Sequence, residues 1–446
     1  MLILKQNGKQ LRRSSSAMNS RIASLPTTLT TRTQQFLAVT FTVLSFLPYL
    51  AIPLGSNTNI PFSAILACLL AVPLFRSPKL LVTSLVMFAL PFVAALLRLF
   101  FDDSPLNANA FLTSIFGVAT VLGAASTFRI LRDSVTPLLS ACISLSAIVA
   151  LVQKFVFLDK GIVPWLEYYD VPGYASVAGN AQTIALYIRR PFGLFPEPSF
   201  LAGSLALATV ALIASISVFK QRYSALSIMA FSLSIITIYV SDSGSGIVCI
   251  VVLAAAAFIP IIRRVKGLLL LLPFVLAGAV WLGLSIAANR QSGVNTSWND
   301  RMASIIGASR LILEEPDMFL FGLGRGMIPS YFESGRVSFA DMTVYSSIPD
   351  VYSVLVRIVL ENGIVFGLPI VVWMVLLVTT EGTSRITLSG VLYFVLWFVV
   401  AALTISYETA AWIWILPGIF LGRRSITSIS KNESTEYHFE DTSHSQ

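Results

Sequence analysis

Long apolar runs separated by short polar connections dominate this chain. The runs lie at 36–54, 60–75, 79–100, 108–126, 135–158, 199–219, 223–240, 245–262, 267–287, 352–379, 385–405 and 408–421. A helix needs about 20 apolar residues to cross a hydrocarbon core about 30 Å thick. Strands of a membrane barrel are shorter and alternate in polarity. The pattern therefore predicts an all-α polytopic membrane protein with about 12 transmembrane helices, or about 10 to 11 if the short, proline-containing runs 60–75 and 408–421 do not cross.

Composition agrees with this class. Apolar residues make up 56% of the chain and charged residues 12%, with a mean hydropathy of +0.80, far from the soluble average. The three cysteines, Cys68, Cys142 and Cys249, lie inside apolar runs and indicate neither a disulfide framework nor a metal site.

The distribution of basic residues predicts the topology. With the N-terminus in the cytoplasm, the outside connections 55–59, 101–107, 241–244 and 406–407 hold no Lys or Arg. Positive residues favour the inside in short loops, whereas long loops translocate largely regardless of charge. We expect cytoplasmic tails at 1–35 and 423–446, the second disordered, around a transmembrane domain at 36–422. Two long connections, 154–198 and 288–350, then face out.

The net charge of +8 is explained by this topology and does not require a nucleic-acid partner. The first 35 residues are basic and contain no Asp or Glu, so an organelle transit peptide is the alternative to a cytoplasmic tail.

The first long connection ends in the segment Arg189 to Ser199, which carries two adjacent arginines and Glu197. Ionisable residues at a bilayer edge are usually kept for a ligand or partner. Pro198 and Ser199 predict a helix start with Ser199 as N-cap, near which anions are favoured. Arg189 and Arg190 there predict a pyrophosphate site, with Glu197 as a candidate general base. The alternative is that the arginines reach lipid head groups and Glu197 neutralises one of them.

The second long connection carries two further arginines. Arg301 begins a predicted helix that Pro316 stops, and the glycines of 322–326 allow a tight bend that presents Arg325. The alternative for Arg325 is a solvated residue in a turn. Further along, Arg357 and Glu361 are spaced for a structural ion pair on one helix.

Some chemistry is excluded by what the predicted outer connections lack. Both histidines, His438 and His444, lie in the C-terminal tail, and the chain has no Asp-x-Asp pair and no phosphate-binding Gly-rich loop with Lys. Catalysis would depend on Arg, Glu, Asp, Tyr and Ser, without a metal or a soluble cofactor. Asp242, in the Ser-rich stretch 241–246, is expected to cap a helix rather than to react.

Four stretches in order carry a resemblance to a known family. They are Phe192 to Ser199, Ser241 to Gly246, the run from Arg301 through Glu314-Glu315-Pro316 to Gly322-Leu323-Gly324, and Glu361 to Gly367. Together they resemble the O-antigen and exopolysaccharide polymerases of the O-antigen polymerase/ligase superfamily, across most of residues 36–421.

The resemblance implies a type C glycosyltransferase-like fold and transfer between polyprenyl-diphosphate-linked oligosaccharides at the outer face of the bacterial inner membrane. By position, it assigns pyrophosphate binding to Arg189, Arg190, Arg301 and Arg325. Arg190 and Arg325 are also catalytic candidates, together with Glu197. Membrane lipid, a flippase and a chain-length regulator are the expected partners. The Ser-rich stretch departs from the family because it lacks an arginine often found there.

Three other functions remain open at this stage. The first is a ligase. Ligases of this superfamily carry a histidine in the second outer loop, and this chain has no histidine there, so the polymerase is favoured over the ligase. A secondary transporter also fits about 12 spans, and predicts half-repeats with helices broken near the bilayer midplane. The third is an assembly protein without chemistry.

Overall fold

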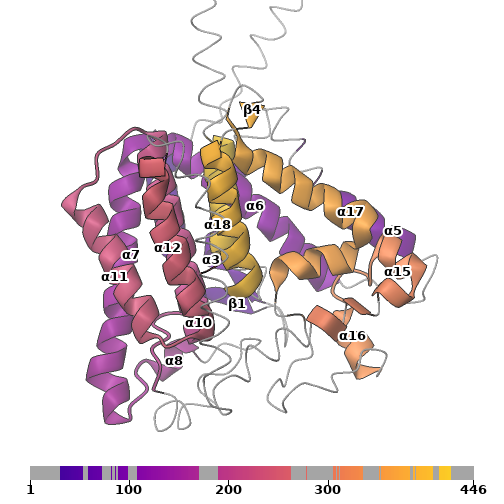
Figure 1. Ribbon diagram of the computed structural model, residues 1–446, viewed down its shortest axis with the longest axis horizontal. Coiled ribbons are helices and arrows are strands. Elements are labelled where there is room, and N and C mark those ends of the chain that lie inside the picture. Colours follow the sequence, from indigo (N-terminus) through magenta and orange to yellow (C-terminus); the bar gives the residue numbers. More distant parts are fainter. Residues whose placement is uncertain are drawn as a thin grey trace, which may run out of the picture.

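The computed structural model describes residues 31–53, 59–72, 82, 86, 89–98, 108–169, 189–262, 278, 305–307, 309–310, 312–334, 351, 353–381, 385–386, 388–404 and 411–422. These residues are predominantly helical (Figure 1). The helices are α2 (Thr31–Leu44), α3 (Phe62–Ala71), α5 (Leu90–Arg98), α6 (Ala108–Leu131), α7 (Val135–Val152), α8 (Leu166–Tyr169), α10 (Pro198–Val218), α11 (Ala225–Val240), α12 (Gly244–Ile262), α15 (Pro316–Phe321), α16 (Ile328–Glu333), α17 (Val354–Thr379) and α18 (Leu388–Thr404). A further apolar helix spans Ala411–Gly422.

The remaining regular structure is local. Strand β1 (Ala51–Pro53) pairs antiparallel with β2 (Asn59–Pro61), and β3 (Thr380–Glu381) pairs antiparallel with β4 (Arg385–Ile386). Beyond α7 the chain continues through a π-helical turn at Gln153–Phe157 and a 3-10 turn. In Figure 1, α7, α11 and α12 lie on one side of the molecule and α5, α15 and α17 on the other, with α18 between them.

Most predicted runs coincide with helices, but the first was misplaced. Helix α2 begins at Thr31, inside the predicted tail, and ends at Leu44. The rest of the run 36–54 turns into β1, whose backbone bonds go to β2 instead of a helix. The run 267–287 lies outside the described residues except for Gly278, and residues 1–30 and 423–446 lie outside them as well.

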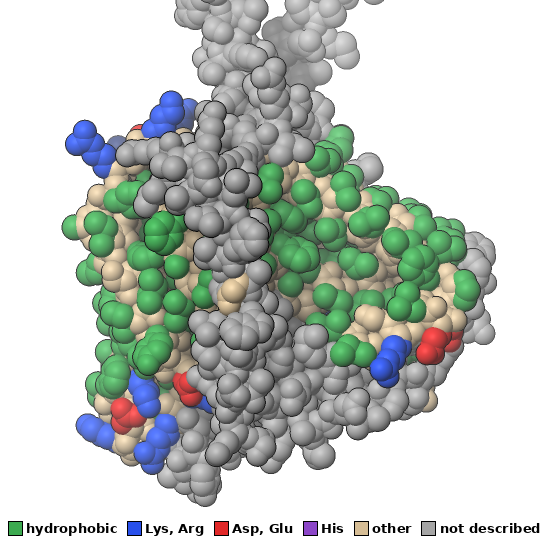
Figure 2. All heavy atoms as spheres, in the orientation of Figure 1, with side chains coloured by type: hydrophobic (Ala, Val, Ile, Leu, Met, Phe, Trp, Pro, Cys, Tyr) green, Lys and Arg blue, Asp and Glu red, His purple; other side chains and the backbone are tan. Residues whose placement is uncertain are grey.

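Three helical runs are long and apolar enough to cross a membrane by length and composition: Phe111–Lys160, Pro198–Val218 and Val354–Leu376. The first is two helices, α6 and α7, because Arg132 takes a left-handed φ of 44° at their junction. Figure 2 shows hydrophobic side chains over the described surface between the ends of the helices, with Lys and Arg gathered at those ends. The described residues therefore form an all-α protein of membrane type. The count of about 12 spans and the type C fold stay predictions.

Helix α10 is the centre of the larger helix group. It contacts α7, α11, α12 and α18, and every side chain from Phe200 to Ile216 is buried. A helix that is apolar all round belongs in a protein core or in a bilayer, and α10 lies in the core of the helix group. Its enclosure explains why its sequence carries no polar stripe.

Hydroxyl groups join α10 to its neighbours. Thr209 bonds Ser234 of α11 at 2.9 Å, and Ser215 bonds Thr136 of α7 at 3.2 Å. A third pair, Ser140 with Ser227 at 3.0 Å, links α7 to α11. Hydroxyl pairs of this kind are a recurring means of joining helices in an apolar medium.

If successive helices cross the membrane in alternating directions, connections predicted on the same side should lie near one another. Two contacts between connections agree with this expectation. Gln221, after α10, donates to the Asp133 carbonyl before α7 at 3.1 Å. At the other end, Arg190 before α10 pairs with Asp242 between α11 and α12. Both pairs join connections that the sequence puts on the same side. Which compartment each end faces stays a prediction.

Small residues permit close packing of α6 on α3. A Cβ atom at Gly123 would lie 2.7 Å from the Cα and Cβ atoms of Ala67. We expect Gly123→Ala to lower the free energy of unfolding by about 1–3 kcal/mol, because the helices must separate. Thermal unfolding in detergent measures this effect. Gly278→Ala is the control, since a Cβ there meets nothing within 4 Å. Equal stability of the two variants would contradict the packing argument.

Candidate functional site

The segment 189–199 is held in place by the end of α7. Gln153, fully buried in the π-helical turn, accepts hydrogen bonds from the backbone N–H groups of Phe192 (2.9 Å) and Gly193 (2.7 Å). Gly193 takes a φ of +58° and packs against Ala150 of α7. π-Helical turns of this kind are frequent at functional sites.

Two tyrosines complete the attachment. The Tyr169 hydroxyl donates to the Gly193 carbonyl and accepts from Gln153 at 3.3 Å, while Tyr168 donates to the Leu194 carbonyl at 3.2 Å. Burial raises the pKa of the Tyr169 phenol, and the bond from Gln153 opposes part of that shift. The phenol therefore stays protonated and able to donate. The sequence alone does not indicate the role of Gln153, because a single glutamine forms no motif.

Helix α10 begins one residue earlier than expected. Pro198 occupies its first turn and Glu197 is the N-cap residue, with extended backbone and no side-chain capping bond. Ser199, predicted to be the cap, lies inside the helix, and its hydroxyl donates to the Glu197 carboxylate. The correction follows from proline, whose fixed φ and missing N–H favour the first helical position. Glu197 is half-buried at the end of the buried helix.

Positive charge gathers at the start of this segment. Arg189 is exposed and has a left-handed φ of 49°, and its carbonyl accepts from Lys154 at 3.1 Å. The side chain of Arg190 is 23% exposed and lies 3.6 Å from the carboxylate of Asp242, which is 53% exposed. Asp242 is therefore an ion-pair partner, a role that sequence analysis did not assign to it.

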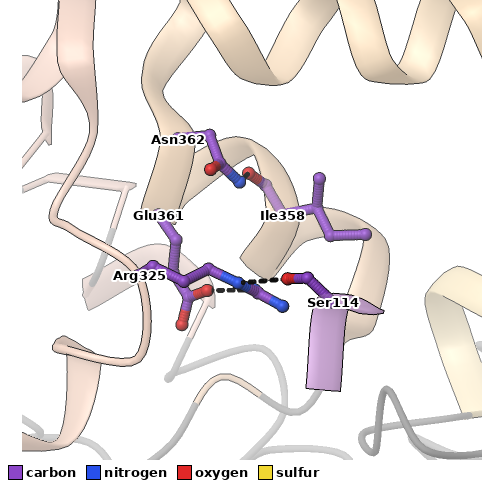
Figure 3. Close-up of polar contacts among 5 residues, drawn as sticks. All are labelled: Ser114, Arg325, Ile358, Glu361 and Asn362. Atoms are coloured by element: carbon purple, nitrogen blue, oxygen red, sulfur yellow. Dashed lines mark hydrogen bonds and ion pairs between the residues drawn. The ribbon is translucent and has the colours of Figure 1, made fainter. Parts of the chain in front are cut away.

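Arg325 lies in a different environment. Its guanidinium donates through Nε to Ser114 of α6 at 3.0 Å and through Nη1 to the Glu361 carboxylate of α17 (Figure 3). The side chains of Arg325 and Glu361 are only 5% and 3% exposed. The alternative of a solvated arginine in a turn is wrong.

A backbone contact makes this burial possible. Helix α17 is interrupted at Gly363, which has φ +67°. The freed carbonyls of Leu360 and Glu361 accept from Leu323 (2.9 Å) and Gly324 (3.1 Å). A Cβ at Gly322 would lie 2.3 Å from the Glu361 carbonyl oxygen, so only glycine fits there. Two stretches of the family resemblance thus meet directly.

Glu361 has a partner that the spacing within α17 does not predict. Arg357 and Glu361 both belong to the first half of this helix, as expected, and Glu361 forms an ion pair with Arg325 of the loop 322–326. The pairing of Arg357 with Glu361 stays a prediction. The loop 322–326 docks at the helix break and brings Arg325 there. Asn362 turns the other way and donates to the Ile358 carbonyl at 2.6 Å (Figure 3).

The two ion pairs differ in how easily they open. Exposed pairs contribute about 0.2–1 kcal/mol, which suits Arg190 and Asp242. Removing one partner of a buried pair costs about 3–5 kcal/mol, which suits Arg325 and Glu361. Arg190 can therefore exchange its partner for an anion at low cost, and Arg325 cannot. Arg301, the fourth predicted arginine, lies outside the described residues.

The described part of the chain contains no cluster of three or more His, Cys, Asp or Glu that could hold a metal ion. Comparison with known proteins adds no assignment: no protein-family model, curated protein or solved structure matches this chain.

The attachment by Gln153 can be tested by substitution. Gln153→Leu leaves the N–H groups of Phe192 and Gly193 without their acceptor, and each such loss costs about 1–3 kcal/mol. We expect a lower unfolding temperature in detergent. Gln221→Leu is the control, because that amide bonds at an exposed position. A Gln153 variant as stable as the control would show that the attachment contributes nothing.

The buried ion pair calls for a double-mutant cycle. Arg325→Met alone is expected to lower the free energy of unfolding by about 3–5 kcal/mol, since the Glu361 carboxylate stays buried without the guanidinium. Arg325→Met with Glu361→Leu should recover most of that loss, because no charge then remains. The measurement is chemical or thermal unfolding of the purified variants. Additive losses in the double variant would argue against coupling.

Proposed function

We propose that this protein is a glycan polymerase of the membrane, which joins polyprenyl-diphosphate-linked repeat units of an O-antigen or exopolysaccharide. The proposal rests on the family resemblance together with one structural observation. That observation is the half-exposed Arg190, next to exposed Arg189, on a segment fastened by Gln153 and Tyr169. Two adjacent arginines on a backbone held in this way suit a diphosphate, whose charge their guanidinium groups can neutralise by charge-assisted bonds.

The proposed reaction is a transfer at an anomeric carbon. A hydroxyl of the acceptor unit forms a new bond to the anomeric carbon of the donor glycan, whose bond to the lipid diphosphate breaks. Arg189 and Arg190 hold the charge that develops on the departing diphosphate, a role that requires fixed positions. The hydroxyl proton passes to the Glu197 carboxylate or to the departing phosphate oxygen.

The other proposed site residues have different roles. Arg325, with its buried carboxylate partner, would serve by fixing the second outer connection on α6 and α17. Arg301 keeps its assignment to a second diphosphate from the resemblance alone. The orientation remains as proposed from the basic residues, with both tails in the cytoplasm and the site at the outer face of the bacterial inner membrane.

A secondary transporter is the second candidate, because α17 is a broken helix. Such breaks often expose backbone carbonyls to an ion or substrate. Here the carbonyls of Leu360 and Glu361 accept from protein N–H groups, which lessens the case for coordination. The polymerase is therefore the better supported function.

The proposal is tested by glycan length in a deletion strain complemented with the wild type or Arg190→Ala. Each charge-assisted bond contributes about 1.5–3 kcal/mol, which corresponds to a transfer rate lower by roughly 10- to 150-fold. We expect a ladder of long glycans with the wild type and short chains with the variant. Arg222→Ala, an exposed arginine between α10 and α11, is the matched control.

Lipid extracts of the deletion strain separate the alternatives. A polymerase leaves single repeat units on the lipid when it is lost, whereas a ligase leaves long unattached chains. Loss of a transporter of another substrate leaves neither. An unchanged ladder in the deletion strain would rule out the polymerase.

A further inference from the structure

We propose that Asp242 is a displaceable counter-ion of Arg190, which occupies the guanidinium until a lipid diphosphate takes its place. This inference rests on the proposed function, because it assigns the diphosphate to Arg190. It adds a residue from the turn between α11 and α12 that no motif assigns to the site.

The geometry of the pair supports exchange rather than permanent pairing. The closest approach, from Arg190 Nη2 to Asp242 Oδ2, is 3.6 Å, longer than a good charge-assisted hydrogen bond. Both side chains reach solvent, so either can leave without being stranded in an apolar medium. A diphosphate carries more negative charge than one carboxylate and offers several acceptor oxygens, so it competes well for the same guanidinium.

A turn of the backbone lies on each side of the pair. Arg189 and Asp242 both have a left-handed φ, at 49° and 47°. At Asp242 this is the usual way for a helix to end, because Asp242 follows the C-cap Ser241 of α11. The turn at Arg189 is held by two contacts: Lys154 donates to the Arg189 carbonyl, and Gln153 accepts from the Phe192 N–H group. The two turns therefore hold Arg190 and Asp242 opposite each other.

The buried pair of Arg325 and Glu361 provides the contrast. Its members are almost fully enclosed, and the guanidinium also donates to Ser114. Opening that pair would strand a carboxylate in the protein interior. Between these two pairs, the pair at Arg190 is therefore the one suited to exchange.

A binding measurement tests this exchange directly. Full-length protein in lipid nanodiscs is titrated with geranylgeranyl diphosphate, with geranylgeraniol as the uncharged comparison. Asp242→Asn should tighten diphosphate binding about two- to fivefold, as expected for loss of an exposed competing pair. Arg190→Ala should weaken binding about tenfold or more. In the Arg190→Ala background, Asp242→Asn should change nothing.

A matched control shows whether the loss of any one negative charge tightens diphosphate binding. Glu167 is an exposed acid on α8, and Glu167→Gln removes one negative charge without touching the pair. Its binding constant should equal that of the wild type. Weaker or unchanged binding by Asp242→Asn would overturn the inference, because Asp242 would then hold Arg190 in place or play no part. The inference would also be overturned if Asp242→Asn tightened diphosphate binding equally in the wild type and in the Arg190→Ala background.

The outcome can be separated from that of the proposed function. If the diphosphate binds as expected but glycan length does not depend on the protein, the polymerase proposal fails and the counter-ion inference stands. If glycan length depends on Arg190 but Asp242→Asn does not tighten binding, the polymerase stands and the counter-ion inference fails. Failure of the wild-type protein to bind the diphosphate overturns the counter-ion inference.

Discussion

The enclosure of α10 is the constraint on which the rest of the structure depends. This helix has no polar face and lies among α7, α11, α12 and α18, so protein side chains rather than lipid cover it. Cross-helix hydroxyl bonds then fix the relative positions of α7, α10 and α11. The segment 189–199 is bonded to Gln153 at Phe192 and Gly193 and continues through Pro198 into α10. The position of Arg190 therefore depends on the packing of this helix group.

Burial decides what each arginine can do. Arg190 lies at the end of the helix group with a half-exposed carboxylate, where solvent lowers the worth of the pair. Arg325 lies inside, and its charge is tolerable only with Glu361 beside it. As arginines, Arg190 and Arg325 carry the same guanidinium group and the same charge. Their surroundings make one suited to a ligand and the other to holding the chain.

The sequence was informative about helices because the thickness of a bilayer imposes a length on apolar runs. It was less informative where side chains from distant segments meet. The spacing of Arg357 and Glu361 predicts a pair within one helix, but it gives no sign that the loop 322–326 brings Arg325 to Glu361. Gln153 was missed because a single glutamine inside an apolar run has no periodic signal. The displaced start of α10 shows a proline outweighing a serine for the first turn.

The break in α17 shows how one local feature can serve two different functions. In a transporter, an interrupted helix leaves carbonyls for a substrate or ion. Here Gly322 and Gly363 approach so closely that a side chain on either would clash, and the loop N–H groups take the carbonyls of Leu360 and Glu361. The break therefore works as a docking point for the second outer connection. Because these carbonyls already accept from the loop, the break in α17 holds the loop 322–326 in place and does not present those two carbonyls to a substrate or ion.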